Sequence, residues 1–148
     1  MARVKVSSSE GIKQEIQAGP HRFFADEPPS AGGSGEGPSP YQLLLAAIGS
    51  CTAITMRLYA NHKGWPLADV RVELEQKVID ASECDECQTT HGKLDSIEKR
   101  IYVVGDLAAD QVDRLLAVAR RCPVSLTLQR EVRFVESITL ESADAEEA

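Results

Sequence analysis

The residues most able to do chemistry in this 148-residue chain are its four cysteines. Cys51 lies inside a long apolar segment, Cys84 and Cys87 form a C-x-x-C pair, and Cys122 stands between two arginines and a proline. A cysteine thiolate is both a nucleophile and a metal ligand. These positions could therefore support redox catalysis, disulfide exchange or metal binding. The alternative for each cysteine taken alone is an inert buried residue.

Cys122 has the strongest intrinsic case for reactivity. It follows Arg120 and Arg121 and immediately precedes Pro123, so it can serve as the N-cap of a short apolar helix that starts there. Nearby positive charge and a helix N-terminus both stabilise a thiolate. Cys51, in contrast, has apolar neighbours, and burial among them disfavours the charged form unless a cation approaches.

The C-x-x-C pair lies in a polar segment, residues 80–95, that also contains His91. The spacing of Cys84 and Cys87 suits half of a zinc site. Only three ligands are available within the segment, however, and the chain has no second C-x-x-C. A pair without a role, a zinc site and a secondary disulfide all stay open as interpretations.

A long helix over residues 40–63 must position Cys51. Ser39 suits the N-cap, Pro40 suits the first helical position, and Gln42 completes a capping box with Ser39. Gly64 can end the helix in a left-handed conformation. The segment is apolar nearly all round, but its uninterrupted apolar run is too short to span a membrane. We therefore expect a deeply buried core helix.

Alternation of polar and apolar residues predicts strands on both sides of this helix. The predicted strands are residues 2–7, 12–16, 21–25, 70–79, 97–104 and 131–140. A second helix is predicted over residues 109–120, and a loop rich in proline, glycine and serine over residues 26–37. This order indicates an α+β fold in which an antiparallel sheet packs on the long central helix.

Length and composition indicate one globular domain, residues 1–140, followed by an acidic tail, residues 141–148. The net charge of −7 argues against nucleic acid or an anionic membrane as a partner. The N-terminus lacks the apolar stretch of a signal peptide, so we expect a cytoplasmic protein with reduced thiols. We expect no cofactor. The central helix is too apolar for one small sheet to cover, which favours a homodimer.

Three segments together resemble a known family. They are residues 32–67 (GGSGEGPSPYQLLLAAIGSCTAITMRLYANHKGWPL), 92–107 (GKLDSIEKRIYVVGDL) and 120–128 (RRCPVSLTL). The chain resembles the OsmC/Ohr family of osmotically inducible and organic hydroperoxide resistance proteins over nearly its whole length. It is most similar to the subgroup with a Cys-x-x-Cys loop between the two middle strands.

The resemblance implies an intertwined homodimer with two active sites at the subunit interface. It implies that Cys51 attacks a hydroperoxide and becomes a sulfenic acid, that Cys122 resolves it as a disulfide, and that a dithiol reductant resets the pair. An arginine near Cys51 would activate it. Arg22, on the third predicted strand, is our candidate, with Arg120 and Arg121 as alternatives.

Three features depart from the family pattern. Peroxidase members carry a glutamate after the proline that opens the central helix, where this chain has Tyr41 and Gln42. We take these two as candidate binding residues. The arginine-bearing N-terminal loop has no clear counterpart, and Ser125 stands where related sequences often have histidine. The missing glutamate motivates a second hypothesis, a non-catalytic module that binds a small hydrophobic ligand on the same dimeric fold.

Overall fold

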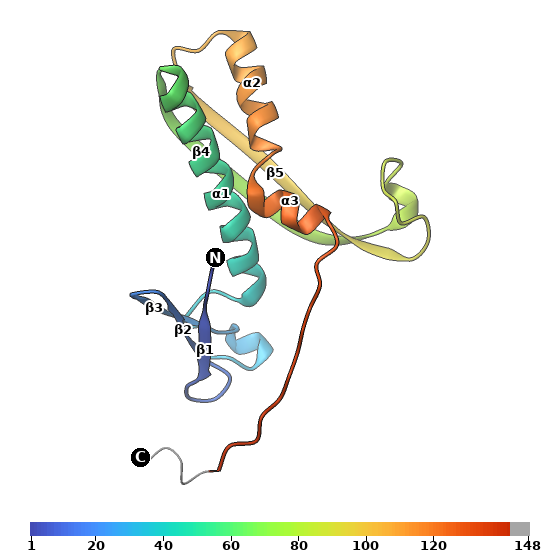
Figure 1. Ribbon diagram of the computed structural model, residues 1–148. Helices are drawn as coiled ribbons and strands as arrows, with labels where there is room; N and C mark the ends of the chain where they lie inside the picture. The colour runs from blue at the N-terminus through green and yellow to red at the C-terminus, as the bar shows by residue number, and fades with distance from the viewer. Residues whose placement is uncertain (143–148) are drawn as a thin grey trace.

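The computed structural model describes residues 1–142 and arranges them around one long helix (Figure 1). The strands are β1 (Lys5–Ser8), β2 (Gln14–Ala18), β3 (His21–Ala25), β4 (Leu67–Asp80) and β5 (Lys93–Gly105). The α-helices are α1 (Pro40–Lys63), α2 (Ala109–Ala119) and α3 (Pro123–Gln129), and short 3-10 turns occupy Pro29–Ala31 and Ala81–Glu83. The predicted α+β class is confirmed.

Helix α1 begins and ends where the sequence predicts. The Ser39 hydroxyl accepts a hydrogen bond from the Gln42 backbone N–H at 3.3 Å, and the Gln42 amide oxygen accepts one from the Ser39 N–H at 2.9 Å. Gly64 ends the helix with φ of 67°, a conformation that glycine adopts without strain. These two caps satisfy backbone groups that a 24-residue helix would otherwise leave without partners.

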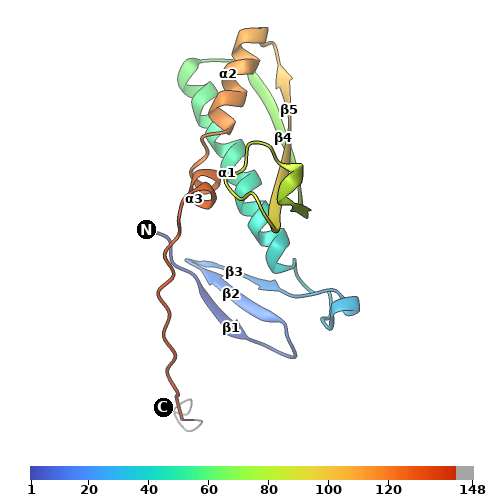
Figure 2. The ribbon, with the colours of Figure 1, turned by 90° about the vertical axis from the view of Figure 1, so that its right-hand side faces the viewer.

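The strands form two antiparallel sheets rather than one. β1, β2 and β3 pair as the predicted meander, while β4 and β5 form a long hairpin. Figures 1 and 2 show the small sheet at the N-terminal end of α1 and the hairpin alongside the helix. Gly49 permits this close packing, since a Cβ there would lie only 2.8 Å from the Leu74 side chain of β4.

Asp26 organises the loop that leads into α1. Its buried carboxylate accepts hydrogen bonds from the backbone N–H groups of Glu27, Ser34 and Glu36, at 2.8 to 3.2 Å. Burial raises the pKa of this carboxyl, but the three hydrogen bonds and the charge of Lys13 outweigh burial and lower it. An ionised Asp26 therefore holds the loop in one conformation and sets the direction from which α1 starts.

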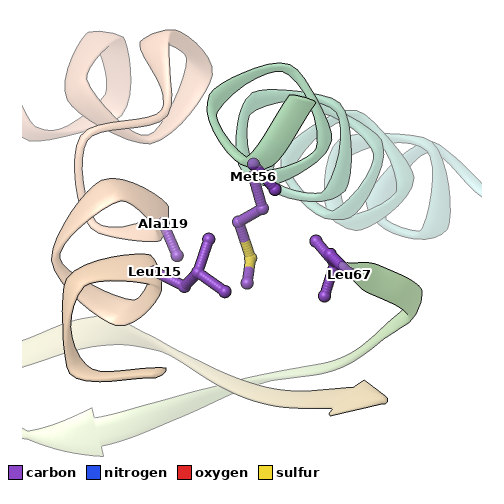
Figure 3. Packing of buried hydrophobic residues seen from close by; sticks show 5 residues of the cluster. Met56, Leu67, Leu115 and Ala119 are labelled. Atoms are coloured by element: carbon purple, nitrogen blue, oxygen red, sulfur yellow. The ribbon is translucent and has the colours of Figure 1, made fainter. Parts of the chain in front are cut away.

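The core lies where α1, α2 and β4 meet. Its fully or nearly fully buried side chains are Met56, Ala60, Leu67, Leu115 and Ala119. Figure 3 shows the Met56 side chain pointing from α1 toward Leu115 of α2. This apolar contact ties the end of α2, and hence the start of α3, to the middle of α1.

The expectation that α1 is deeply buried is wrong for the single chain. Ile54 and Leu58 are 57% and 64% exposed, because the hairpin, α2 and α3 leave one side of the helix uncovered. By length and a mean hydropathy of 1.5, α1 could also span a membrane, a property that it shares with core helices of soluble proteins. Among the described residues, no element of this chain covers the exposed apolar side chains Ile54 and Leu58.

The predicted closing strand, residues 131–140, is also wrong. This segment leaves α3 in an extended path away from the hairpin, and its apolar side chains are exposed, including Phe134 at 79% and Ile138 at 99% (Figure 1). Within residues 1–142, no strand pairs with it, so it cannot form the hydrogen bonds that define a strand. The predicted acidic tail lies outside the described residues from 143 onward.

We expect Met56→Ala to lower the free energy of unfolding by about 2–5 kcal/mol, because it leaves a cavity between α1 and α2. Urea denaturation monitored by circular dichroism measures this change. Val104→Ala is the control, since Val104 is 59% exposed and should change stability by less than about 0.5 kcal/mol. Equal effects of the two variants would contradict the location of the core.

Candidate active site

Cys122 occupies the N-cap position of α3, as predicted, and is completely buried. Its Sγ accepts a hydrogen bond from the Ser125 backbone N–H at 3.3 Å. Pro123 takes the first helical position, where the missing N–H has no consequence. The fold thus places this thiol at the junction between α2 and α3, facing α1.

Two hydroxyl groups contact the Cys122 sulfur. Ser125 Oγ lies 2.9 Å from Sγ on the same helix, and Thr52 Oγ1 lies 3.5 Å from it on α1. Thr52 immediately follows Cys51, so this contact brings the two free cysteines of the chain to the same place. The sequence could not show that they meet, since 70 residues separate Thr52 from Cys122.

The environment of Cys122 favours its thiolate. Burial raises the pKa of the thiol, but hydrogen bonds from the Ser125 hydroxyl, Thr52, the Ser125 backbone and Cys51 outweigh burial and lower the pKa to about 7. A substantial fraction of Cys122 is therefore ionised at neutral pH. The sequence-based expectation of a reactive Cys122 agrees with this environment, although hydroxyl groups rather than the predicted arginines make the contacts.

Cys51 differs from Cys122 in its access to solvent. It is partly exposed on α1 and has a free thiol, whereas Cys122 is fully enclosed. Cys51 is the residue before Thr52, which contacts the Cys122 sulfur, and Cys51 is among the groups that lower the pKa of Cys122. A molecule that approaches from solvent can therefore meet Cys51 before Cys122.

Lys99 of β5 is the cation of this site, and our sequence analysis did not identify it. Its ammonium group donates hydrogen bonds to Thr52 Oγ1 at 3.0 Å, the Ala119 carbonyl at 3.2 Å and Ser125 Oγ at 3.4 Å. A signal was available: strand alternation places Lys99 on the same side as Ile97 and Ile101. A lysine on the inward side of a strand needs polar partners.

A cavity of about 510 Å³ lies beside Ser125 and Lys99, and neither Cys51 nor Cys122 is among its lining residues. Ile48, Ile97 and Leu128 supply apolar lining, while Lys99, Arg120 and Ser125 supply polar groups. The cavity is thus suited to a small molecule with both an apolar part and a polar part.

The structure does not bring the other predicted site residues to the thiols. Arg22 lies on the small sheet, where it is exposed and 3.7 Å from Glu15, so its predicted approach to Cys51 does not occur within this chain. Gln42 uses its amide oxygen to cap α1, and Tyr41 is 60% exposed beside it. Of the three arginine candidates, Arg120 lines the cavity beside Ser125 and Lys99.

Cys84 and Cys87 form a disulfide in the loop that joins β4 to β5. Of the interpretations that the sequence left open, the structure therefore has the secondary disulfide. Among the described residues, no group of three or more acidic, histidine or cysteine side chains could hold a metal ion, and His91 is exposed. The zinc hypothesis is not supported, because both of its sulfur ligands are bonded to each other.

Comparison with known proteins agrees with this architecture. The sequence profile of the family described as OsmC-like protein matches residues 33–137. Among solved structures, an OsmC-like protein from Mycoplasma pneumoniae superposes with a TM-score of 0.69 at 16% identity, covering 87% of each chain. An organic hydroperoxide resistance protein OsmC from Legionella pneumophila gives 0.62 at 20% identity, covering 87% of this chain and 89% of the other.

The organic hydroperoxide resistance protein OhrB of Bacillus subtilis has the same fold, with a TM-score of 0.56 at 20% identity, covering 85% of this chain and 88% of that one. No curated protein matches the sequence significantly. The fold and the paired thiols define the class as small α+β proteins with a cysteine on a long central helix. The chain belongs to the OsmC-like protein family.

We expect Cys122 in the Cys51→Ser variant to titrate with a midpoint well below the ordinary 9.0, because the hydrogen bonds with Ser125 and Thr52 that lower its pKa remain. The variant isolates one titrating thiol, because Cys84 and Cys87 are bonded to each other. Ultraviolet absorbance of the thiolate measures the midpoint. Ser125→Ala in the same background should raise it, since the largest of the lowering hydrogen bonds is lost. An unchanged midpoint would contradict the role of the Ser125 hydroxyl.

Proposed function

We propose that this protein is a thiol-dependent redox protein that reduces organic hydroperoxides through Cys51 and Cys122. The observation that carries the proposal is the pairing itself: the partly exposed Cys51 precedes Thr52, whose hydroxyl contacts the buried Cys122 thiol, and the pKa of Cys122 is lowered to about 7. Membership of the OsmC-like family supports it, as do neighbours named organic hydroperoxide resistance proteins.

We assign the attacking and the resolving role from the difference in solvent exposure between the two thiols. Cys51, as a thiolate, attacks the distal oxygen of the hydroperoxide, the O–O bond breaks, and a Cys51 sulfenic acid forms. The alkoxide that leaves takes a proton and becomes an alcohol. The Cys122 sulfur then attacks the sulfenic sulfur, an S–S bond forms, and the hydroxide that leaves is protonated to water. Two electrons pass from the two thiols to the hydroperoxide.

A dithiol reductant returns the Cys51–Cys122 disulfide to two thiols by thiol–disulfide exchange. This cycle needs a supply of dithiol reductant, which the cytoplasm provides, so the cytoplasm is the compartment that we propose. The Cys84–Cys87 disulfide departs from the expectation that all thiols are reduced. The cavity beside Ser125 and Lys99 offers apolar lining for the organic group of the hydroperoxide.

We also propose that the working form is a homodimer. The uncovered side of α1 exposes Ile54 and Leu58, and the extended segment 131–140 exposes further apolar side chains. Burial of such surface against a second copy is favourable, and closed twofold symmetry is its commonest form.

The same cavity supports a second candidate function. A space of about 510 Å³ with apolar lining could hold a small hydrophobic ligand without any reaction. In that case the two thiols would react slowly with peroxide and with alkylating reagents alike.

One equivalent of cumene hydroperoxide should convert Cys51 and Cys122 of the reduced protein to a disulfide, and dithiothreitol should reverse it. Peptide mapping by mass spectrometry identifies the bridge. Cys51→Ser should abolish consumption of the hydroperoxide, because it removes the attacking sulfur. Cys122→Ser should stop turnover after one equivalent and leave an oxidised Cys51.

The matched control is the double variant Cys84→Ser/Cys87→Ser, which removes the other pair of sulfurs and should still form the Cys51–Cys122 bridge. Peroxide consumption by Cys51→Ser at the wild-type rate would contradict the proposed mechanism. Sluggish oxidation and alkylation of both thiols in the wild-type protein would favour ligand binding instead.

Leu58→Asp should shift the protein from dimer to monomer, because it places a charge on the apolar side of α1 that a second copy would cover. Light scattering after size-exclusion chromatography measures the mass. Asn61→Asp, which introduces the same charge at an exposed polar position of this helix, should leave the mass unchanged. A dimer that persists in Leu58→Asp would exclude this side of α1 from the interface.

A further inference from the structure

The hydrogen-bond donors of Lys99 are fully used by three groups of the site. Its ammonium has three hydrogens, and the structure provides three acceptors within 3.0 to 3.4 Å: Thr52 Oγ1, the Ala119 carbonyl and Ser125 Oγ. These acceptors come from α1, α2 and α3, so one side chain of β5 joins all three helices. Two of the three are hydroxyl groups, which can also donate.

Each of those hydroxyls lies within reach of the same sulfur. A hydroxyl that accepts from Lys99 keeps its own hydrogen for another acceptor, and Cys122 Sγ lies 2.9 Å from Ser125 Oγ and 3.5 Å from Thr52 Oγ1. When Cys122 is a thiol, it donates its hydrogen to Ser125 Oγ. When Cys122 loses that hydrogen, the Ser125 hydroxyl can reverse and donate to the thiolate.

Thr52 offers a second, switchable donor. Its single hydrogen can go to the Ile48 carbonyl at 2.8 Å or to Cys122 Sγ at 3.5 Å, but not to both at full strength. Because charge-assisted hydrogen bonds are stronger than neutral ones, a negative sulfur draws this hydrogen toward itself. The positive charge of Lys99 polarises both hydroxyls in the same direction.

The other charged groups near the site do not duplicate this arrangement. On α1 the neighbouring titratable group is the Cys51 thiol, and on β5 it is Asp95, which lines the adjoining cavity beside Lys99. Arg120, at the end of α2, lines the same cavity. Among these, Lys99 is the cation that is hydrogen-bonded to both groups that contact the Cys122 sulfur.

We propose that Lys99 is a positioning residue that holds the negative charge of the reduced site on Cys122, acting through the hydroxyls of Thr52 and Ser125. This inference rests on the proposed function and deepens it, because it assigns the proton acceptor that Cys51 needs. The Cys51 S–H bond breaks, its hydrogen forms a new S–H bond with the Cys122 thiolate, and Cys51 becomes the thiolate. No electrons leave the pair in this step.

We call the arrangement of Lys99, the two hydroxyls and Cys122 the relay. The relay also acts in the second step, in which Cys122 attacks the sulfenic acid. Cys122 gives its proton to the leaving alkoxide and is again a thiolate, now opposite a sulfenic acid. Lys99 is not consumed and touches neither sulfur in this arrangement. Its contribution is to keep one negative charge inside a buried pair, where an uncompensated charge is costly.

The first test is titration of Cys122 in the Cys51→Ser background, with and without Lys99→Met. We expect Lys99→Met to raise the midpoint by about one pH unit or more, which is a roughly tenfold fall in the ratio of thiolate to thiol at a given pH. Lys93→Met is the matched control on the same strand. Lys93 is 66% exposed and pairs with Asp80, so its loss should leave the midpoint unchanged.

A double-mutant cycle separates the relay from a structural role. Thr52→Val/Ser125→Ala should raise the midpoint by itself, and Lys99→Met added to that pair should raise it no further. Additive shifts would overturn the proposal, since they would mean that Lys99 acts independently of the hydroxyls. A Lys99→Met protein with reduced thermal stability but an unchanged midpoint would also overturn it, in favour of a purely structural lysine.

The titration tests the role of Lys99 and the peroxide assay tests the proposed reaction, so one result can be negative while the other is positive. A midpoint that depends on Lys99 in a protein that does not consume cumene hydroperoxide supports the relay and contradicts the proposed reaction. Rapid formation of the Cys51–Cys122 bridge with a midpoint insensitive to Lys99→Met contradicts the relay and supports the reaction.

Discussion

The buried sulfur of Cys122 is the constraint on which the rest of this structure depends. A polar atom enclosed at the junction of three helices and a strand is tolerated only if its hydrogen bonds are satisfied. The partners come from separate elements: Thr52 from α1, Ser125 from α3, and Lys99 from β5 behind both. Their mutual distances hold only when α1, the hairpin and the α2–α3 junction are packed together. The site and the core therefore form as one unit.

The apolar core supplies the packing that this polar cluster needs. Met56 and Leu115 join α1 to α2 close to the point where α2 ends and Cys122 begins α3. The caps at Ser39 and Gly64 fix where α1 starts and stops, and Gly49 lets it approach β4. Local sequence signals and long-range packing thus agree at each of these positions. Such agreement between levels is what specifies a single fold.

Two apolar surfaces that the chain leaves uncovered support the proposed homodimer. At the exposed apolar residues of α1 and at the extended segment 131–140, the sequence-based expectations of a buried helix and a closing strand were wrong. Both hydrophobic patterns are present in the sequence, and both mark apolar surfaces that the second copy of the proposed homodimer would cover. Hydrophobic patterning records whether a residue is to be covered, but not whether its own chain or a second copy covers it.

The sequence by itself determined the caps and bounds of α1, the meander, the hairpin strands, and Cys122 as an N-cap, because capping, alternation and turn residues act over a few positions. It also indicated the family through its cysteine-bearing segments. Only the tertiary structure decided that Cys51 and Cys122 meet, that Cys84 bonds to Cys87, and that Lys99 rather than Arg22 is the cation beside the thiols. Lys99 and Ser125 are 26 residues apart in the chain. Their contact depends on how β5 and α3 pack on α1, which no local pattern encodes.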